Sequence, residues 1–193
     1  MDASTPLNEE EQKGLKPNLA TRRELDDWEY KNVLEARVWA TDSRQLKRYD
    51  PLTESYVRKL HEQMFNQTWK WAGTYRSSEK ANIGVPFHQI RNMVPALLGD
   101  ARYWVDHHTF DIDEIAIRFH HRLVWIHPFP NGNGRHARLL ADVIATKFGR
   151  DTFTWGSKEL VDEGPARTEY IRCLKLADAN NDDIQPLMKF VRS

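Results

Sequence analysis

The twelve residues HPFPNGNGRHAR, at positions 127–138, constrain the fold more than any other stretch of the chain. Two prolines and the pair Asn131-Gly132 oppose a continuous helix through them. Apolar residues recur with helical spacing on both sides, over about 112–126 and about 139–148. We therefore expect a loop here that joins two packed helices.

Helical spacing also dominates the chain from about residue 21 onward, so the expected fold class is mainly α. Thr21 with Glu24 predicts a capping box that opens a helix through about residue 40. Asp50 followed by Pro51 predicts an N-cap with proline at the first helical position. A further helix is expected around 90–104, and shorter helices are expected near the C-terminus.

The segment GTYRSSEKANIGVPF, which begins at Gly73, differs from its surroundings. Glycine, paired serines and proline interrupt it too often for a helix. It predicts a β-hairpin or a loop.

Composition narrows the functional classes. A chain of 193 residues is long enough for one domain with a real core. Its 28 basic and 28 acidic residues form no basic excess, which argues against nucleic-acid or membrane-surface binding. Cys173 is the single cysteine, so a disulfide framework is excluded. Neither a signal peptide nor an apolar transmembrane run is visible, and a cytoplasmic location is expected.

The predicted loop has the properties of an anion site. A loop that ends at a helix N-terminus presents free N–H groups and the positive end of the helix dipole. Gly132 and Gly134 allow positive φ angles and a close approach of phosphate. Arg135 and Arg138 lie on one face of the first turn, where basic side chains oppose the dipole unless an anion binds there.

His127 lies at the other end of this loop, where an imidazole can accept a proton from a hydroxyl group. Three plainer interpretations stay open at this point: a helix-capping histidine, an Asn-Gly turn and two surface arginines. The loop is not a Walker motif, because no lysine followed by Ser or Thr comes after the glycines.

The motif resembles the signature of the Fic family, His-x-Phe-x-(Asp or Glu)-Gly-Asn-Gly-Arg-x-x-Arg. The opening TPLNEEEQKGL is further similar to the bacterial subgroup called mobile mystery protein B. This resemblance implies a Fic-type helical bundle with a small β-hairpin flap. It implies a helical N-terminal extension over residues 1–49 and a Fic domain over residues 50–193.

The resemblance also implies a protein adenylyltransferase that moves AMP from ATP to a Ser, Thr or Tyr hydroxyl of a target protein. His127 would be the general base, and Phe129 would anchor the loop in the core. The backbone of Gly132, Asn133 and Gly134, with the Asn133 side chain, would hold the α- and β-phosphates. Arg135 and Arg138 would bind the outer phosphates, and Asn131 would complete the nucleotide site. The flap would bind the target by strand addition along Lys80, Ala81, Asn82, Ile83, Gly84 and Val85.

Asn131 departs from the family pattern, which has Asp or Glu at the position that coordinates Mg²⁺. An amide oxygen is a weaker ligand for Mg²⁺ or Mn²⁺ than a carboxylate. Three outcomes are open: a metal held mostly by the phosphates with Asn131 assisting, nucleotide binding without efficient transfer, or transfer of another group.

Many family members also carry an inhibitory helix with the pattern (Ser or Thr)-x-x-x-Glu-(Gly or Asn). The nearest match is TPLNEE, in which Glu10 replaces Gly or Asn. Two interpretations stay open: Glu9 pairs with Arg138 and inhibits, or Glu9 belongs to a solvated acidic face. Without an internal inhibitor, an antitoxin-like regulator becomes the expected partner, and a homodimer is left open.

Competing functions are a catalytically weak nucleotide-binding module and a transferase of another phosphate-containing group, including a kinase. DNA binding lacks a basic patch. The pairs His107-His108 and His120-His121 do not predict zinc, because adjacent helical side chains point in different directions. One of His120 and His121 is expected to face the site.

Overall fold

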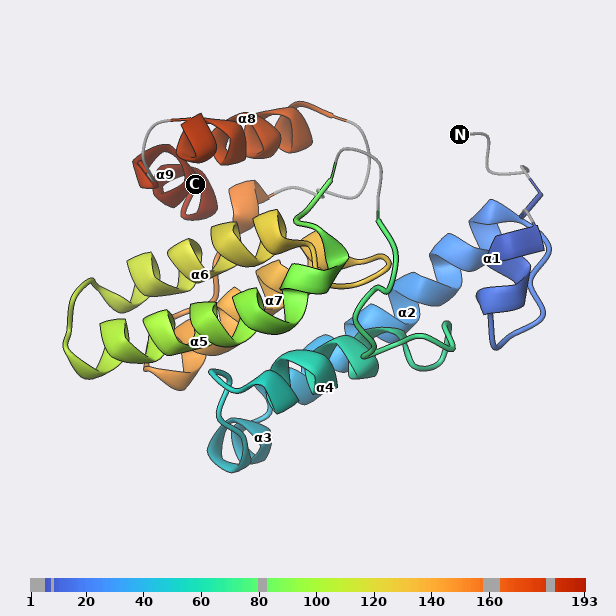
Figure 1. Ribbon diagram of the computed structural model, residues 1–193, viewed down its shortest axis with the longest axis horizontal. Helices are drawn as coiled ribbons and strands as arrows, with labels where there is room; N and C mark the ends of the chain where they lie inside the picture. The colour runs from blue at the N-terminus through green and yellow to red at the C-terminus, as the bar shows by residue number, and fades with distance from the viewer. Residues whose placement is uncertain (1–5, 8, 80–82, 158–163, 180–182) are drawn as a thin grey trace.

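The computed structural model describes residues 6–7, 9–79, 83–157, 164–179 and 183–193 (Figure 1). The α-helices are α1 (Glu9–Gly14), α2 (Arg22–Thr41), α3 (Ser43–Arg48), α4 (Glu54–Phe65), α5 (Ile90–Asp106), α6 (Ile112–Ile126), α7 (Asn133–Lys147), α8 (Pro165–Ala179) and α9 (Gln185–Val191). Two short 3₁₀ turns, η1 (Phe87–Gln89) and η2 (Trp155–Ser157), complete the described elements. The predicted mainly α class is confirmed.

Helix α7 lies at the centre of the fold. It packs against α6, α4, α2 and α3, and α5 packs on α6 (Figure 1). Its buried residues are Asn133, His136, Ala137, Leu139, Leu140, Ala141, Asp142, Val143, Ile144 and Ala145. A helix that is buried on most sides is a rigid support, so groups at its first turn have fixed positions.

Helix α2 packs against α4, which attaches the N-terminal extension to the rest of the fold. The predicted capping box is present, with Thr21 Oγ1 accepting from Glu24 N at 3.3 Å. Asn32, buried between the helices, donates to Gln63 O and accepts from Gln67 N, both at 3.1 Å. Residues 22–41 therefore contribute to the same core as α4 and α7.

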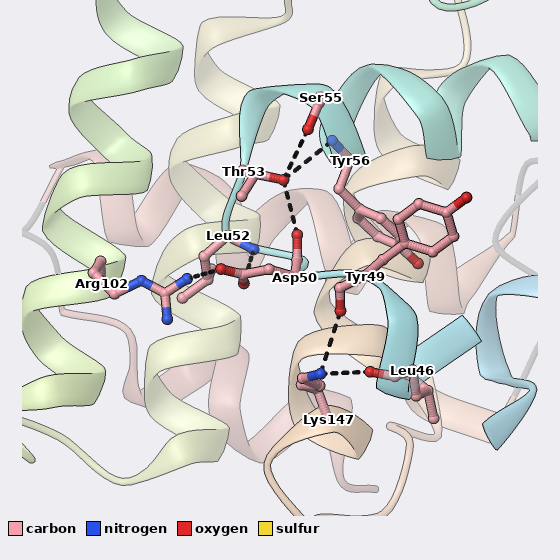
Figure 2. A network of polar contacts seen from close by, with 9 residues as sticks. All are labelled: Leu46, Tyr49, Asp50, Leu52, Thr53, Ser55, Tyr56, Arg102 and Lys147. Carbon is pink, nitrogen blue, oxygen red and sulfur yellow. Dashed lines mark hydrogen bonds and ion pairs between the residues drawn. The ribbon is translucent and has the colours of Figure 1, made fainter. Parts of the chain in front are cut away.

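Helix α4 begins later than predicted, and the assignment of Asp50 as its N-cap is wrong. Thr53 is the N-cap and its Oγ1 accepts from Tyr56 N at 3.3 Å. Asp50 accepts from Leu52 N at 3.0 Å and pairs with Arg102 of α5 (Figure 2). The Asp50 carboxylate therefore bonds within the turn and to a distant arginine, and it does not cap α4.

The same connection is also fixed to the far end of α7. The Lys147 ammonium donates to Leu46 O and to Tyr49 O, and Figure 2 shows it beneath this turn. The C-terminal end of α7 is therefore held by contacts with the N-terminal half of the chain.

The C-terminal helices α8 and α9 pack on each other, and α9 also contacts α6 (Figure 1). Asp142 of α7 holds the segment before α8 by accepting from Phe153 N at 3.0 Å and from Trp155 Nε1 at 3.1 Å. Burial raises the pKa of Asp142. None of the described helices combines the length and apolar character needed to span a membrane.

Residues 73–86, here called the flap segment, form no strand in their described part. Lys80, Ala81 and Asn82 lie outside the described residues. The two arms bond to the end of α6: Arg76 N donates to Pro128 O at 2.9 Å and Val85 N donates to Ile126 O at 3.3 Å. These two amides therefore bond to residues 126–128 and not to the opposite arm, as they would in a β-hairpin.

Candidate active site

His127 directly follows α6 and has a left-handed backbone conformation, with φ 54° and ψ 59°. Such a conformation is costly for a residue other than glycine and persists only where the surroundings hold it. His127 N donates to Leu123 O at 3.1 Å, and His127 O accepts from Arg76 Nε at 2.8 Å. Both backbone polar groups of the predicted catalytic histidine are therefore fixed.

The loop after His127 is anchored by Phe129, as predicted. Its ring is fully buried and stacks on His61 with 3.7 Å between ring centroids. His61 Nδ1 accepts from Gly73 N at 3.0 Å, so the proton lies on Nε2, which donates to Asn131 O at 3.1 Å. Burial holds the pKa of His61 well below its usual value, and the ring is neutral.

Asn133, whose side chain is predicted to bind phosphate, closes the loop through its amide group. Its Oδ1 accepts from Phe129 N at 2.9 Å and its Nδ2 donates to Phe129 O at 2.8 Å. Gly132 N is also engaged, by Asn131 Oδ1 at 2.7 Å. The N–H groups that α7 can offer an anion are therefore those of its first turn, residues 133–135.

His127 and this first turn line one cavity of about 930 Å³, a volume in the range of small-molecule sites. The walls come from α2, the flap segment, α6, the loop, α7 and α8. Among the described residues of the lining, the charged ones are Arg22, Asp26, Glu29, Arg135, Arg138 and Arg167. Four arginines against two carboxylates make this cavity suitable for a polyanion.

Arg138 lies against α8. Its guanidinium is 5.5 Å from the centre of the Tyr170 ring. The Tyr170 hydroxyl is 3.0 Å from His120 Nε2. Burial lowers the pKa of His120 to about 3, so this imidazole is neutral and adds no charge next to Arg138. His120 therefore supports the site wall, whereas His121 pairs with Asp178 at 2.8 Å.

Arg135 makes a contact that the sequence reasoning missed. Its Nη1 lies 2.6 Å from Glu29 Oε2, and Glu29 also accepts from Trp69 Nε1. The side chain of Glu29 is only 8% exposed. The sequence feature that could have indicated this contact is the position of Glu29 on the buried face of α2, between Leu25 and Asn32. A glutamate in such a stripe needs a partner.

Of the two interpretations of Glu9, the structure supports the solvated acidic face and contradicts the pair with Arg138. The side chain of Glu9 is 92% exposed and lies 3.9 Å from Lys13 on the same helix. Helix α1 is held elsewhere, because Lys16 N donates to Thr68 O at 2.9 Å and Leu15 forms a bridge with Trp69. The glutamate that meets a motif arginine is Glu29, and that arginine is Arg135.

Comparison with known families agrees with this geometry. Residues 51–145, about half of the chain, match the model of the Fic/DOC family. This chain carries a Fic/DOC family domain. Two curated relatives are named "Protein adenylyltransferase Fic": one from Nematostella vectensis is 37% identical over 40% of this chain, and one from Drosophila melanogaster is 36% identical over 37%. The aligned regions cover only 16% and 13% of those proteins.

Solved structures show the same fold. The N-terminal Fic domain of a Bartonella quintana effector has a TM-score of 0.70 at 16% identity and covers all of this chain and 89% of its own. BepC from Bartonella tribocorum, solved with bound AMPPNP, has a TM-score of 0.68 at 17% identity and covers all of this chain and 93% of its own. The predicted Fic-type helical bundle is therefore confirmed.

The tight contact beneath the loop gives a stability prediction. Gly132 has a φ of +75°, and a Cβ added there would lie 2.3 Å from Phe65 Cζ. Gly132→Ala should lower the free energy of unfolding by about 2–4 kcal/mol, because strain and overpacking add. Gly149→Ala is the matched control, since its φ is +81° but its surroundings are open. Urea unfolding measures both, and equal losses would contradict the proposed packing.

The Glu29–Arg135 pair gives a binding prediction. A phosphate on Arg135 must share the guanidinium with a nearby carboxylate, so removing that negative charge should favour ATP. Glu29→Gln is expected to strengthen ATP binding about fivefold, the effect of roughly 1 kcal/mol. Calorimetry measures it, with exposed Glu35→Gln on the same helix as control. Weaker binding would mean instead that Glu29 orients Arg135 for the nucleotide.

Proposed function

We propose that this Fic domain is a protein adenylyltransferase that transfers AMP from ATP to a Ser, Thr or Tyr hydroxyl of a target protein. One observation carries the proposal: His127, the start of α7, Arg135 and Arg138 line the same cavity. A base, an anion-binding helix start and two cations within one cavity are the parts that nucleotidyl transfer requires. The names of the curated relatives support the same activity.

The triphosphate would lie across the first turn of α7. The N–H groups of residues 133–135 and the helix dipole would hold the phosphates nearest the adenosine. Arg138 and Arg135 would bind the outer phosphate oxygens. Because phosphoryl chemistry depends mainly on positioning and charge stabilisation, these fixed donors supply most of what the reaction needs.

His127 would remove the proton from the target hydroxyl. The hydroxyl oxygen then bonds to the α-phosphorus, and the bond from that phosphorus to the oxygen bridging to the β-phosphate breaks. Pyrophosphate leaves with that oxygen, and the imidazolium returns its proton to solvent. Negative charge that develops on the phosphates is stabilised by the helix start and the two arginines.

The flap segment is the expected docking strip for the target. Ile83 lines the cavity beside Ser78, and Gly84 and Val85 follow it. Lys80, Ala81 and Asn82 complete the predicted strip and lie outside the described residues. Strand addition uses backbone hydrogen bonds. The flap would therefore bind an extended segment of the target protein and depend little on the side chains of that segment.

The residues of this cavity fit a resident Mg²⁺ or Mn²⁺ poorly. Asn131 offers a neutral amide oxygen that already accepts from Gly132 N. Of the two carboxylates in the described lining, Glu29 is engaged by Arg135. The ion is therefore expected to arrive as MgATP, as part of the co-substrate. An antitoxin-like regulator, a homodimer and a cytoplasmic location stay predictions.

ATP labelled separately at the α- and γ-phosphates tests the proposed reaction. With lysate as the source of targets and Mg²⁺ or Mn²⁺ present, protein should be labelled from the α-position alone. His127→Ala should remove that label by at least about 100-fold, the contribution of a general base. Label from the γ-position alone would identify a kinase. ATP binding without transfer would favour a nucleotide-binding module and contradict the proposal.

Asn131→Asp tests whether the amide limits the chemistry. A carboxylate is a stronger ligand for a hard cation, so the variant should raise the transfer rate and lower the Mg²⁺ concentration needed for half-maximal rate. A metal titration of the transfer assay measures both. Unchanged metal dependence would show that residue 131 does not contact the ion.

A further inference from the structure

Arg76 is a buried arginine that joins three separate backbone segments. Its Nε donates to His127 O at 2.8 Å, its Nη1 to Ser78 O at 3.1 Å, and its Nη2 to Val85 O. Arg76 N also donates to Pro128 O at 2.9 Å. One planar group therefore connects both arms of the flap segment to the residue after α6.

The burial of this guanidinium costs free energy, because a charge is removed from water. The side chain of Arg76 is 2% exposed, and its acidic neighbour Glu79 is 60% exposed at 3.7 Å. Such an ion pair compensates little of the desolvation of a buried charge. The hydrogen bonds to the three carbonyls compensate most of this desolvation cost. Because the guanidinium is planar and rigid, it also restricts the positions of these carbonyls.

The second arm of the flap segment touches His127 directly. Gly84 has a φ of +81°, and a Cβ added there would lie 2.6 Å from His127 Cβ and 3.1 Å from Ile126 O. Only a residue without a side chain allows this approach. The flap segment and His127 are thus in van der Waals contact. The same added Cβ would lie 3.0 Å from Arg76 Nη2, so the guanidinium lies next to this contact.

We propose that Arg76 is a positioning residue that couples the flap segment to His127. Because one rigid group bonds to both arms and to the His127 carbonyl, a target segment held by the flap would be presented at a set distance from the imidazole. Small errors in such distances have large effects on rate. This inference rests on the proposed transferase function, and it concerns the target side of the site and not the phosphates.

Two substitutions test it. Arg76→Met removes all three bonds, and Arg76→Lys keeps the charge but cannot span three carbonyls with a rigid fork. Both should lower kcat for AMP transfer by about 10- to 100-fold. The KM for ATP should change less than about threefold, because Arg76 does not line the phosphate cavity. General destabilisation alone would not produce this separation of kcat from KM in folded enzyme.

Arg58→Met is the matched control. Arg58 Nε donates to Gly73 O at 3.0 Å and its guanidinium lies over the Tyr75 ring, so it supports the same segment. None of its described bonds reaches His127. This variant should keep kcat within about threefold of the parent protein.

Hydrogen exchange gives a readout that needs no activity. Val85 N donates to Ile126 O, so its exchange reports how firmly the flap segment is held on α6. Exchange should accelerate about tenfold or more in both Arg76 variants and not in Arg58→Met. Should Arg76→Met fail to fold by circular dichroism, Arg76→Lys alone carries the test.

The outcomes separate the two proposals. If the parent protein transfers no AMP, the proposed function fails, and the exchange of Val85 alone decides whether Arg76 couples the segments. If the parent protein is active, unchanged kcat in Arg76→Lys or unchanged exchange of Val85 overturns the role of Arg76. A fall in kcat with faster exchange, absent in Arg58→Met, supports it.

Discussion

The two hydrogen bonds between the Asn133 amide and the backbone of Phe129 hold the joint on which the rest of the site depends. They close the turn from Phe129 to Asn133 and leave the Phe129 ring buried against His61. With both helices packed together, the turn fixes His127 at one side and the start of α7 at the other. The separation of His127 from the first turn of α7 is therefore set by the packing of the core.

Charge in the cavity follows from this arrangement. Basic side chains in the first turn of a helix oppose its dipole, and α7 has two of them. Glu29 offsets the charge of Arg135, while Arg138 lies over Tyr170. A bound polyphosphate would neutralise the two arginines in place of Glu29 and Tyr170. A protein with balanced overall charge can therefore have more arginines than carboxylates among the described residues of this cavity.

The sequence allowed prediction of features set by neighbouring residues. The helix–loop–helix joint, the Thr21 capping box and the buried Phe129 all depend on short-range patterns. Asp50 was misassigned because a carboxylate before proline can either cap a helix or accept a hydrogen bond within a turn. In the structure it accepts from Leu52 N and pairs with Arg102 of a distant helix, which the local sequence does not indicate. Glu29 was missed because its partner is 106 residues away.

The contacts of the Asn133 side chain with Phe129 could not be predicted for a related reason. Its amide suits a phosphate or a backbone turn equally well by chemistry, and only its burial shows which groups it meets. The role of Arg76 was likewise not predictable, because in the sequence it is one charged residue of a polar segment. The three carbonyls that it joins come together only when the flap segment folds back on the end of α6.

The central claim is that the joint between α6 and α7 binds ATP with the α-phosphate facing His127. A crystal structure with a non-hydrolysable ATP analogue tests it most directly. We expect phosphate oxygens within hydrogen-bond distance of the N–H groups of residues 133–135, with the imidazole beside the α-phosphorus. A fully occupied analogue whose triphosphate lies away from the first turn of α7 would contradict the account.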